Sequence, residues 1–408
     1  MELLAPAGNL EKLKTAIRFG ADAVYCGGGA FSLRAPDTAF SLEDLAEGVR
    51  FAHDHNSRVY LALNIFAFDD DLKAMLHYYR EAAGLGIDAV IISDPGFLML
   101  VNELGYDQKI HLSTQVNTMN SDAVKFWQKQ GVDRIVLARE LSLDQVRTIK
   151  ENVPEMELEV FVHGAMCMAY SGRCLLSSFL SSRSANRGDC NQPCRWEYSL
   201  KEKQREDEFT IQEDGRGTYI LNSRDLCMIE HIPELAAAGV DGLKIEGRMK
   251  TAYYVAAVTK VYRSALDSFH ADRKNYCFNR GWLEELKKVS HRPFTTGFYL
   301  PEKNDQTERY ESSAYIRGYD FVGTVDGFDR EMQLLKIRAR NRFSVGDELE
   351  ILDPAREVVF AVQVGQIISS ESGEQLDAAH NSYIVEVPLA GEIKPAISEH
   401  SIIRKKVC

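Results

Sequence analysis

Cysteines gathered in the middle of the chain are the residues whose type and spacing most clearly suggest chemistry. Five of the eight cysteines fall in one stretch of the sequence: Cys167, Cys174, Cys190, Cys194 and Cys227. Structural zinc sites usually use pairs spaced C-x2–4-C, and only Cys190 and Cys194 form such a pair. Iron–sulfur clusters accept irregular spacing, because the thiolates need only surround the cluster. The spacing leaves three interpretations open: an iron–sulfur cluster, a zinc site, or ordinary buried or free thiols.

The charge around these cysteines differs from that of the whole chain. The formal net charge is −12, which argues against a surface that is basic throughout and binds nucleic acid everywhere. From Gly172 to Arg205, however, there are seven Lys or Arg against three acids. This local excess indicates either a solvated loop or a contact with an anion such as a phosphate backbone.

Polar residues also follow nearly every predicted strand of the first half of the chain. In a barrel of parallel strands these positions form the active-site face, although any one of them could simply cap a loop. The candidates are Cys26, Asn64, Asp94, Ser113, Gln115, Asn117, Arg139, Glu140, His163, Glu246 and Arg248. The metalloprotease motif H-E-x-x-H and the hydrolase motif G-x-S-x-G are both absent from the sequence.

The elements that must position these residues alternate regularly. Apolar runs typical of buried strands alternate with segments of helical period, and the runs are at 2–8, 23–28, 58–65, 89–94, 109–117, 134–140, 158–164 and 242–247. Eight such strands favour an α/β fold, a (β/α)8 TIM-like barrel, over an open doubly wound sheet. We also predict helix caps at Ser41, Ser121 and Ser142.

The domain organisation follows from where this alternation stops. We expect the barrel to occupy residues 1–300, with a cysteine-rich insertion at 164–220 after its seventh strand. Residues 291–300 read as a linker because they contain Pro293 and Gly297. From about residue 315 the period is that of strands, which predicts a small all-β barrel or sandwich at 301–408. No segment resembles a signal peptide or a membrane span, so we expect a cytoplasmic protein that does not bind membranes.

Several motifs resemble those of one known family. The segment from Glu159 to Ser177, EVFVHGAMCMAYSGRCLLS, resembles the signature of peptidase family U32, the collagenase-like proteases. The segments ELLAPAGN, NSRDLC, KIEGRMK and HRPFTTGF are also similar to that family, and FSVGDELEIL is similar to its accessory β-domain. The resemblance covers essentially the whole chain and is greatest to the family's tRNA 5-hydroxyuridine synthases.

This resemblance implies a function and a set of site residues. It implies oxygen-independent hydroxylation of the wobble uridine of tRNA, with prephenate as the oxygen donor and a 4Fe-4S cluster as cofactor. The implied cluster ligands are Cys167, Cys174, Cys190 and Cys227, with Cys194 as an alternative ligand. A U32-type peptidase and a non-catalytic scaffold that holds zinc are the alternative functions.

The implied binding and catalytic roles can be assigned to particular residues of the chain. The anticodon loop is single-stranded, so its wobble base can enter the barrel mouth. Arg139, Arg248 or Lys244 could hold the carboxylates of the small acid, or could form structural ion pairs. We therefore expect the catalytic residues to be Arg139, His163, Glu246 and Arg248. Trp196 and Tyr198 could stack a base or lie in the core, and the sequence leaves the oligomeric state open.

Overall fold

The computed structural model describes most of the 408 residues. The described ranges are 1–33, 39–167, 169–193, 212–214, 217–219, 224–300, 315–355, 359–389 and 397–407. Three residues singled out from the sequence lie outside these ranges: Cys194, Trp196 and Tyr198.

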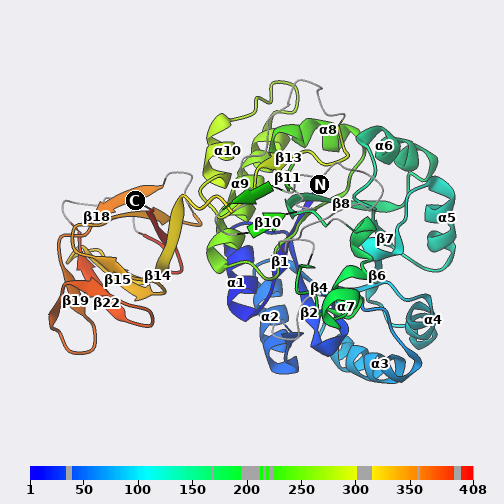
Figure 1. The fold of residues 1–408 in the computed structure, drawn as a ribbon, viewed down its shortest axis with the longest axis horizontal. Helices are drawn as coiled ribbons and strands as arrows, with labels where there is room; N and C mark the ends of the chain where they lie inside the picture. Colours follow the sequence, from blue (N-terminus) through cyan, green and yellow to red (C-terminus); the bar gives the residue numbers. More distant parts are fainter. Residues whose placement is uncertain are drawn as a thin grey trace, which may run out of the picture.

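A closed barrel of parallel strands forms the larger part of the structure (Figure 1). Within the described residues its eight strands are β1 (Glu2–Ala7), β2 (Ala23–Gly28), β4 (Arg58–Leu63), β5 (Ala89–Ile92), β6 (Lys109–Leu112), β7 (Arg134–Val136), β8 (Glu157–Ala165) and β12 (Gly242–Ile245). Because β12 pairs with both β1 and β8, the sheet closes on itself. This confirms the (β/α)8 barrel, and each strand coincides with one of the predicted apolar runs.

Helices surround the barrel on its outer side (Figure 1). They are α1 (Leu10–Arg18), α2 (Leu42–Asp54), α3 (Asp69–Gly84), α4 (Pro95–Leu104), α5 (Ser121–Lys129), α6 (Leu143–Asn152), α8 (Ile232–Ala237) and α9 (Ala252–Ala271). Ser41 and Ser142 cap α2 and α6 as predicted. The cap of α5 is Asn120 rather than Ser121, because Asn120 is the last residue with extended backbone and its side chain accepts the N–H of Ala123. None of the described helices is long and apolar enough to cross a membrane.

The insertion after β8 returns to the barrel through one additional short strand. It contains α7 (Leu176–Ser181) and the hairpin of β9 (Gln212–Asp214) and β10 (Gly217–Tyr219), and then β11 (Asp225–Cys227) pairs antiparallel with β8. After α9 come α10 (Arg280–Leu286) and β13 (Phe294–Thr295), and β13 pairs in parallel with β11.

The linker predicted at 291–300 is wrong. This segment contains β13, and His291 and Arg292 before it are 5% and 2% exposed. The backbone N–H of Arg292 donates to Asp225 Oδ2 at 3.1 Å. The residues that suggested a linker lie at the two ends of the strand: Pro293 precedes it, and Gly297 turns the chain after it with φ +61°.

The C-terminal part is a separate antiparallel sheet (Figure 1). Its strands are β14 (Tyr319–Asp329), β15 (Leu334–Ala339), β17 (Glu348–Leu352), β18 (Phe360–Gln363), β19 (Ile367–Ser369), β20 (Gln375–Leu376), β22 (Ile384–Pro388) and β23 (Ile402–Lys406). The short strands β16 (Phe343–Ser344) and β21 (Ala378–Ala379) pair with each other, and β3 (Ala39–Phe40) pairs with β2 in the barrel. The sheet encloses its own apolar core, which confirms the predicted small all-β domain.

The small domain is fastened to the barrel by a buried arginine. Arg404 on β23 is 0% exposed, and its NH2 lies 2.9 Å from Glu285 Oε2 on α10 and 2.7 Å from Glu350 Oε2 on β17. Its NH1 donates to the hydroxyl of Tyr253 on α9 at 3.2 Å. Because a guanidinium can donate to two carboxylates at once, one side chain joins two barrel helices to the small sheet.

The interior of the barrel carries charge at the end where the strands begin. Arg134 NH2 lies 2.8 Å from Glu2 Oε2 and 2.6 Å from Glu157 Oε2, and its NH1 lies 3.2 Å from Glu159 Oε2. Glu159 is 0% exposed and also accepts a hydrogen bond from Lys244 Nζ at 2.7 Å. Buried charges persist only when they are paired, and this network pairs all three of its carboxylates with cations.

Burial lowers the pKa of three histidines of the barrel domain, His111, His163 and His291. His111 on β6 is 1% exposed, and burial together with the cations Arg134 and Lys244 lowers its pKa well below the usual value. Its ring packs edge-on against Tyr60 at 4.6 Å between centroids. Burial also lowers the pKa of His163, to about 3.

These three histidines predict a loss of stability in mild acid. The unfolded chain binds a proton at each histidine below about pH 6.5 and the folded chain does not, so the free energy of unfolding falls as pH falls below that value. The expected slope is about 1.4 kcal/mol per pH unit for each histidine. Urea unfolding measured at several pH values between 5 and 7 tests this, and His111→Phe should lower the slope by about 1.4 kcal/mol per pH unit, the share of one histidine. An unchanged slope in that variant would contradict the assignment.

Candidate active site at the barrel mouth

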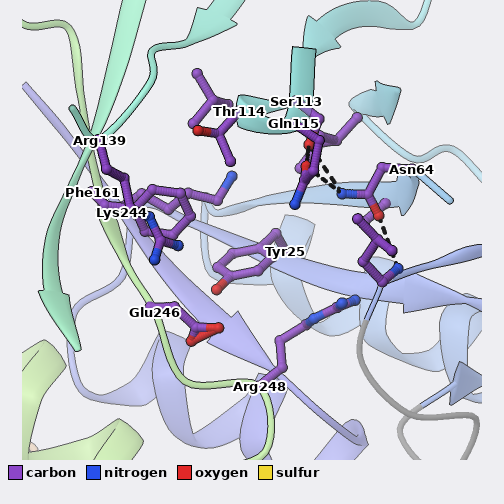
Figure 2. A pocket seen from close by; sticks show the side chains of 14 residues that line it. Tyr25, Asn64, Ser113, Thr114, Gln115, Arg139, Phe161, Lys244, Glu246 and Arg248 are labelled. Carbon is purple, nitrogen blue, oxygen red and sulfur yellow. Dashed lines mark hydrogen bonds between the residues drawn. The ribbon is translucent and has the colours of Figure 1, made fainter. Parts of the chain in front are cut away.

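A pocket opens at the end of the barrel where the strands finish (Figure 2). It encloses about 470 Å³ of space, counting the part open to solvent. It is lined by Tyr25, Leu33, Ala62, Asn64, Ile91, Ser113, Thr114, Gln115, Val136, Arg139, Phe161, Lys244, Glu246 and Arg248. The lining residues come from seven barrel strands and the loops after them: β2, β4, β5, β6, β7, β8 and β12. Barrel enzymes place their active sites at this end of the barrel.

Lys244 occupies the floor of this pocket. Its ammonium lies 2.7 Å from Glu159 Oε1 and 4.5 Å from the centre of the Tyr25 ring. Burial lowers the pKa of Lys244, whereas the Glu159 carboxylate opposes that shift. The Tyr25 ring lies in the middle of the pocket (Figure 2), and its hydroxyl donates to the carbonyl of Ile245 at 3.0 Å. The floor is thus a fixed cation beside an aromatic face.

Two arginines form the walls on either side of Tyr25 (Figure 2). The guanidinium carbon of Arg139 lies 3.7 Å from the centre of the Phe161 ring, and its NH1 donates to the carbonyl of Ala165 at 3.0 Å. Arg248 NH1 donates to Ser32 Oγ at 3.0 Å. Both side chains are 8% exposed or less.

A glycine makes room for one of these arginines. A Cβ atom on Gly27 would lie 2.7 Å from Arg248 NH1 and 2.4 Å from Ser32 Oγ, closer than side chains pack. The strand β2 therefore needs glycine at this position because the guanidinium lies against its backbone.

Amide and hydroxyl groups line the remaining wall. Asn64 Nδ2 donates to Ser113 Oγ at 3.0 Å and to Gln115 Oε1 at 3.3 Å, and its Oδ1 accepts the N–H of Leu33 at 3.1 Å. Ser113 Oγ also donates to Gln115 Oε1. These bonds orient the Gln115 amide nitrogen toward the pocket (Figure 2).

The arrangement is rich in hydrogen-bond donors. Lys244, Arg139 and Arg248 supply cations and Gln115 an amide N–H, whereas Glu246 is the single carboxylate among the lining residues. Fixed donors in a desolvated site bind carboxylate or carbonyl oxygens strongly. The pocket is therefore suited to a small ligand with several such oxygens.

The cysteine-rich insertion lies against the rim of this pocket. Arg173 Nε donates to the backbone carbonyl of Gln115 at 2.6 Å. The backbone N–H and the hydroxyl of Ser171 donate to the two oxygens of Glu140 at 2.6 and 2.7 Å. Arg187 reaches back to Asp71 at the start of α3 at 2.6 Å. The insertion is thus attached to loops that follow β4, β6 and β7.

The thiols of the insertion differ in their exposure to solvent. Cys167 and Cys190 are exposed, Cys174 is half-buried and Cys227 is buried. Burial raises the pKa of Cys227 to about 12. Among the residues that the structure describes, no three His, Cys, Asp or Glu side chains lie together as the ligands of a metal ion would. We therefore assign no chemical step to a cluster, and its four ligands stay a prediction.

The structure divides the other predicted site residues into two groups. Asn64, Ser113, Gln115, Arg139, Glu246 and Arg248 line the pocket, whereas Cys26, Asp94, Asn117, Glu140 and His163 do not. The residues of the second group have other positions or structural roles. Asp94 caps α4, Asn117 ends a short helical turn with φ +59°, Cys26 is fully buried, and Glu140 holds the insertion.

His163 lies outside the pocket because β8 contains a bulge. Phe161 pairs with Lys244, but the next pair is His163 with Ile245, so the alternation of side chains shifts by one residue. His163 therefore packs against Tyr262 of α9, at 5.6 Å between ring centroids, and is 1% exposed. Its catalytic role stays a prediction, and the geometry gives it no direct contact with the pocket.

Pocket residues that sequence reasoning missed are apolar or aromatic. Tyr25 and Phe161 point into the barrel because they occupy inward positions of β2 and β8. The alternation of each strand could have identified them, since every second residue faces inward. The exception is the polar residue Thr114, which lies between the candidates Ser113 and Gln115, two positions after the end of β6.

Comparison with known proteins gives a consistent result along the whole chain. The model for peptidase family U32 matches residues 8–309, and that for the peptidase family U32 C-terminal domain matches residues 317–404.

Three named relatives differ in what their names describe. The chain is 40% identical over 396 residues to the tRNA hydroxylation protein P1 of Bacillus subtilis, covering 97% of this chain and 93% of that protein. It is 33% identical over 408 residues to the Collagenase of Porphyromonas gingivalis, covering 97% and 96%. It is 36% identical over 316 residues to the 23S rRNA 5-hydroxycytidine C2501 synthase of Escherichia coli, covering 75% and 46%.

The pair formed by Glu159 and Lys244 predicts a specific pattern of stabilities. Glu159→Gln leaves the Lys244 ammonium buried without its carboxylate, so the free energy of unfolding should fall by about 3–5 kcal/mol. The double variant Glu159→Met, Lys244→Met removes both charges and should recover most of that loss. Urea unfolding of the three proteins measures this, and a single variant within about 1 kcal/mol of the wild type would contradict the pairing.

Proposed function

The chain belongs to peptidase family U32, and from this premise we propose that it is an enzyme that hydroxylates RNA. The proposed substrate is the wobble uridine of tRNA, which becomes 5-hydroxyuridine. The observation that carries the proposal is the 40% identity, over nearly the whole of both chains, with a protein named for tRNA hydroxylation. A second relative is named for hydroxylation of a pyrimidine in ribosomal RNA.

The pocket at the barrel mouth supports the proposal that an RNA base swings out of its loop and enters the enzyme. A base of a single-stranded loop can swing out and enter an enzyme pocket at modest energetic cost. The polar wall of Asn64, Ser113 and Gln115 offers hydrogen-bonding groups at the depth such a base would reach. The Tyr25 ring beside it offers an aromatic face.

The cationic side chains of the pocket support the proposal that the co-substrate is a small carboxylic acid. We propose that Arg139, Arg248 and Lys244 bind carboxylates of this acid, and that prephenate is the acid and the donor of the oxygen. All three side chains line one pocket, and each is 8% exposed or less. Electrostatic attraction is strong at such desolvated positions. Their role in this proposal is to bind and orient the acid beside the base.

A 4Fe-4S cluster is a further part of the proposal. Its ligands would be Cys167, Cys174, Cys190 and Cys227, with Cys194 as the alternative. Thiolates are the usual ligands of such clusters, and the insertion that carries them contacts the pocket rim through Arg173. Of the four, Cys167 and Cys190 are exposed and Cys227 is buried.

Peptide cleavage is the second candidate function. It is favoured by the 33% identity with a protein named Collagenase. The lack of the H-E-x-x-H and G-x-S-x-G motifs weighs against a conventional hydrolytic mechanism. Peptidase activity that persists through purification and disappears with Arg248→Met would favour this function over the first.

The hydroxylase proposal predicts a defined change in cellular tRNA. Cells that lack the gene should lose 5-hydroxyuridine and its derivatives, as measured by nucleoside mass spectrometry, and the intact gene should restore them. Arg248→Met should restore them at a rate lower by roughly 30-fold or more, because removing one partner of a buried charge pair costs about 2 kcal/mol or more. Arg147→Met is the matched control, because Arg147 lies on the surface of α6. Unchanged tRNA in cells without a second family member would refute the proposal.

The cluster proposal makes a separate prediction about metal content. Protein purified without oxygen should contain about four iron and four sulfide per chain. Cys174→Ser should lose most of both, whereas Cys277→Ser should retain them, because Cys277 is an exposed cysteine beyond the insertion. Zinc without sulfide would instead support the scaffold with a zinc site.

A further inference from the structure

Large apolar side chains gather in the loops at the barrel mouth and are left open to water. They follow three different barrel strands, β4, β8 and β12: Phe68, Tyr170, Leu175, Phe179, Leu180 and Met249. Phe179 is 85% exposed, Leu175 76% and Phe68 68%. Single exposed apolar residues are ordinary, but a group of them around one opening marks a binding surface. We call these six residues the mouth rim.

Arginines lie between the aromatic residues of this region. The guanidinium carbon of Arg187 lies 5.0 Å from the centre of the Phe68 ring. Asp71 fixes the same guanidinium with bonds of 2.6 and 2.9 Å, so the pair is held in place. Arg173 lies 5.6 Å from the centre of the Phe66 ring in the same way. Such pairs of an arginine and an aromatic ring present a flat face beside a cation.

The charge of the insertion agrees with an anionic partner. From residue 169 to 193 there are three arginines and one aspartate, which gives a net charge of +2 in a chain whose total is −12. The insertion side of the rim therefore combines exposed aromatic faces with local positive charge, whereas three aspartates follow Phe68 at the start of α3. Proteins that hold single-stranded nucleic acid use this combination, because bases stack on the rings and phosphates approach the cations.

We propose that the mouth rim binds a single-stranded RNA loop by stacking its bases on Phe68 and Phe179. This inference rests on the proposed function, because it assigns the nucleotides that flank the modified base to these two rings. Phe68 belongs to the loop after β4 and Phe179 to the insertion after β8. Nucleotides on the two rings would leave the base between them free to enter the pocket.

Binding of a labelled RNA hairpin, followed by fluorescence anisotropy with the full-length chain, tests this assignment. Phe68→Ala and Phe179→Ala should each weaken binding of the loop by roughly 5- to 100-fold. Phe68→Trp should keep the affinity, because tryptophan also offers a stacking face. Phe126→Ala is the matched control, since Phe126 is 53% exposed on α5 and lies outside the rim.

A second readout separates stacking from a merely structural effect. A fluorescent purine analogue in the loop should lose emission on binding to the wild-type chain and keep it on binding to Phe68→Ala or Phe179→Ala. A fully paired duplex should bind more weakly than the hairpin and respond little to these substitutions.

The outcomes distinguish this inference from the proposed function. If both alanine variants bind the hairpin and hydroxylate tRNA as the wild type does, the rim assignment is overturned and the hydroxylase proposal stands. If the wild type binds hairpins through Phe68 and Phe179 but leaves tRNA unmodified in cells, the hydroxylase proposal fails while the RNA-binding rim stands. A duplex bound as tightly as the hairpin would also overturn the rim.

Discussion

The Glu159 carboxylate, buried between Lys244 and Arg134, is the interaction on which the rest of the barrel domain depends. It lies on β8, next to the strand β12 that closes the barrel, and its two partners come from β12 and β7. A buried carboxylate requires paired cations, and Lys244 requires Glu159 in turn, whereas Arg134 also pairs with Glu2 and Glu157. The same pair holds Lys244 at the pocket floor, so the stability of the barrel and the shape of its binding site arise from one contact. The neighbouring Gly242 has no side chain, and a Cβ atom there would lie 3.1 Å from Glu159 Cγ.

Around that floor, the barrel strands and the insertion contribute different functions. The strands supply Tyr25, Phe161 and Lys244 from positions fixed by sheet pairing. The insertion supplies exposed rings and thiols, and it contacts the barrel through a few polar bonds such as those of Ser171 to Glu140. Loops on a rigid scaffold commonly carry substrate recognition. Here the same insertion carries the proposed RNA contacts and the proposed cluster ligands.

Much of this architecture could be predicted because it rests on local patterns. All eight barrel strands coincide with apolar runs, since strands buried on both faces are almost continuously apolar. The predictions that failed concerned features that depend on contacts between residues far apart in the sequence. The bulge that turns His163 away from the pocket arises from the pairing of β8 with β12, which sequence spacing does not reveal. The segment with Pro293 was predicted to be a linker. Its strand β13 pairs with β11, which lies far away in the sequence, so no local pattern indicates the pairing.

The small sheet shows the same limit, and its last strand has a consequence for how the chain folds. β23 (Ile402–Lys406) was not predicted, since Arg404 and the two lysines after it obscure its apolar half. It nevertheless lies between β17 and β14 and carries the arginine that joins the sheet to α10. During synthesis β14 and β17 each keep one edge unpaired until a strand made about fifty residues after β17 has emerged. All eight barrel strands have been made by the end of β12, whereas the small sheet and its contact with α10 cannot be complete before β23.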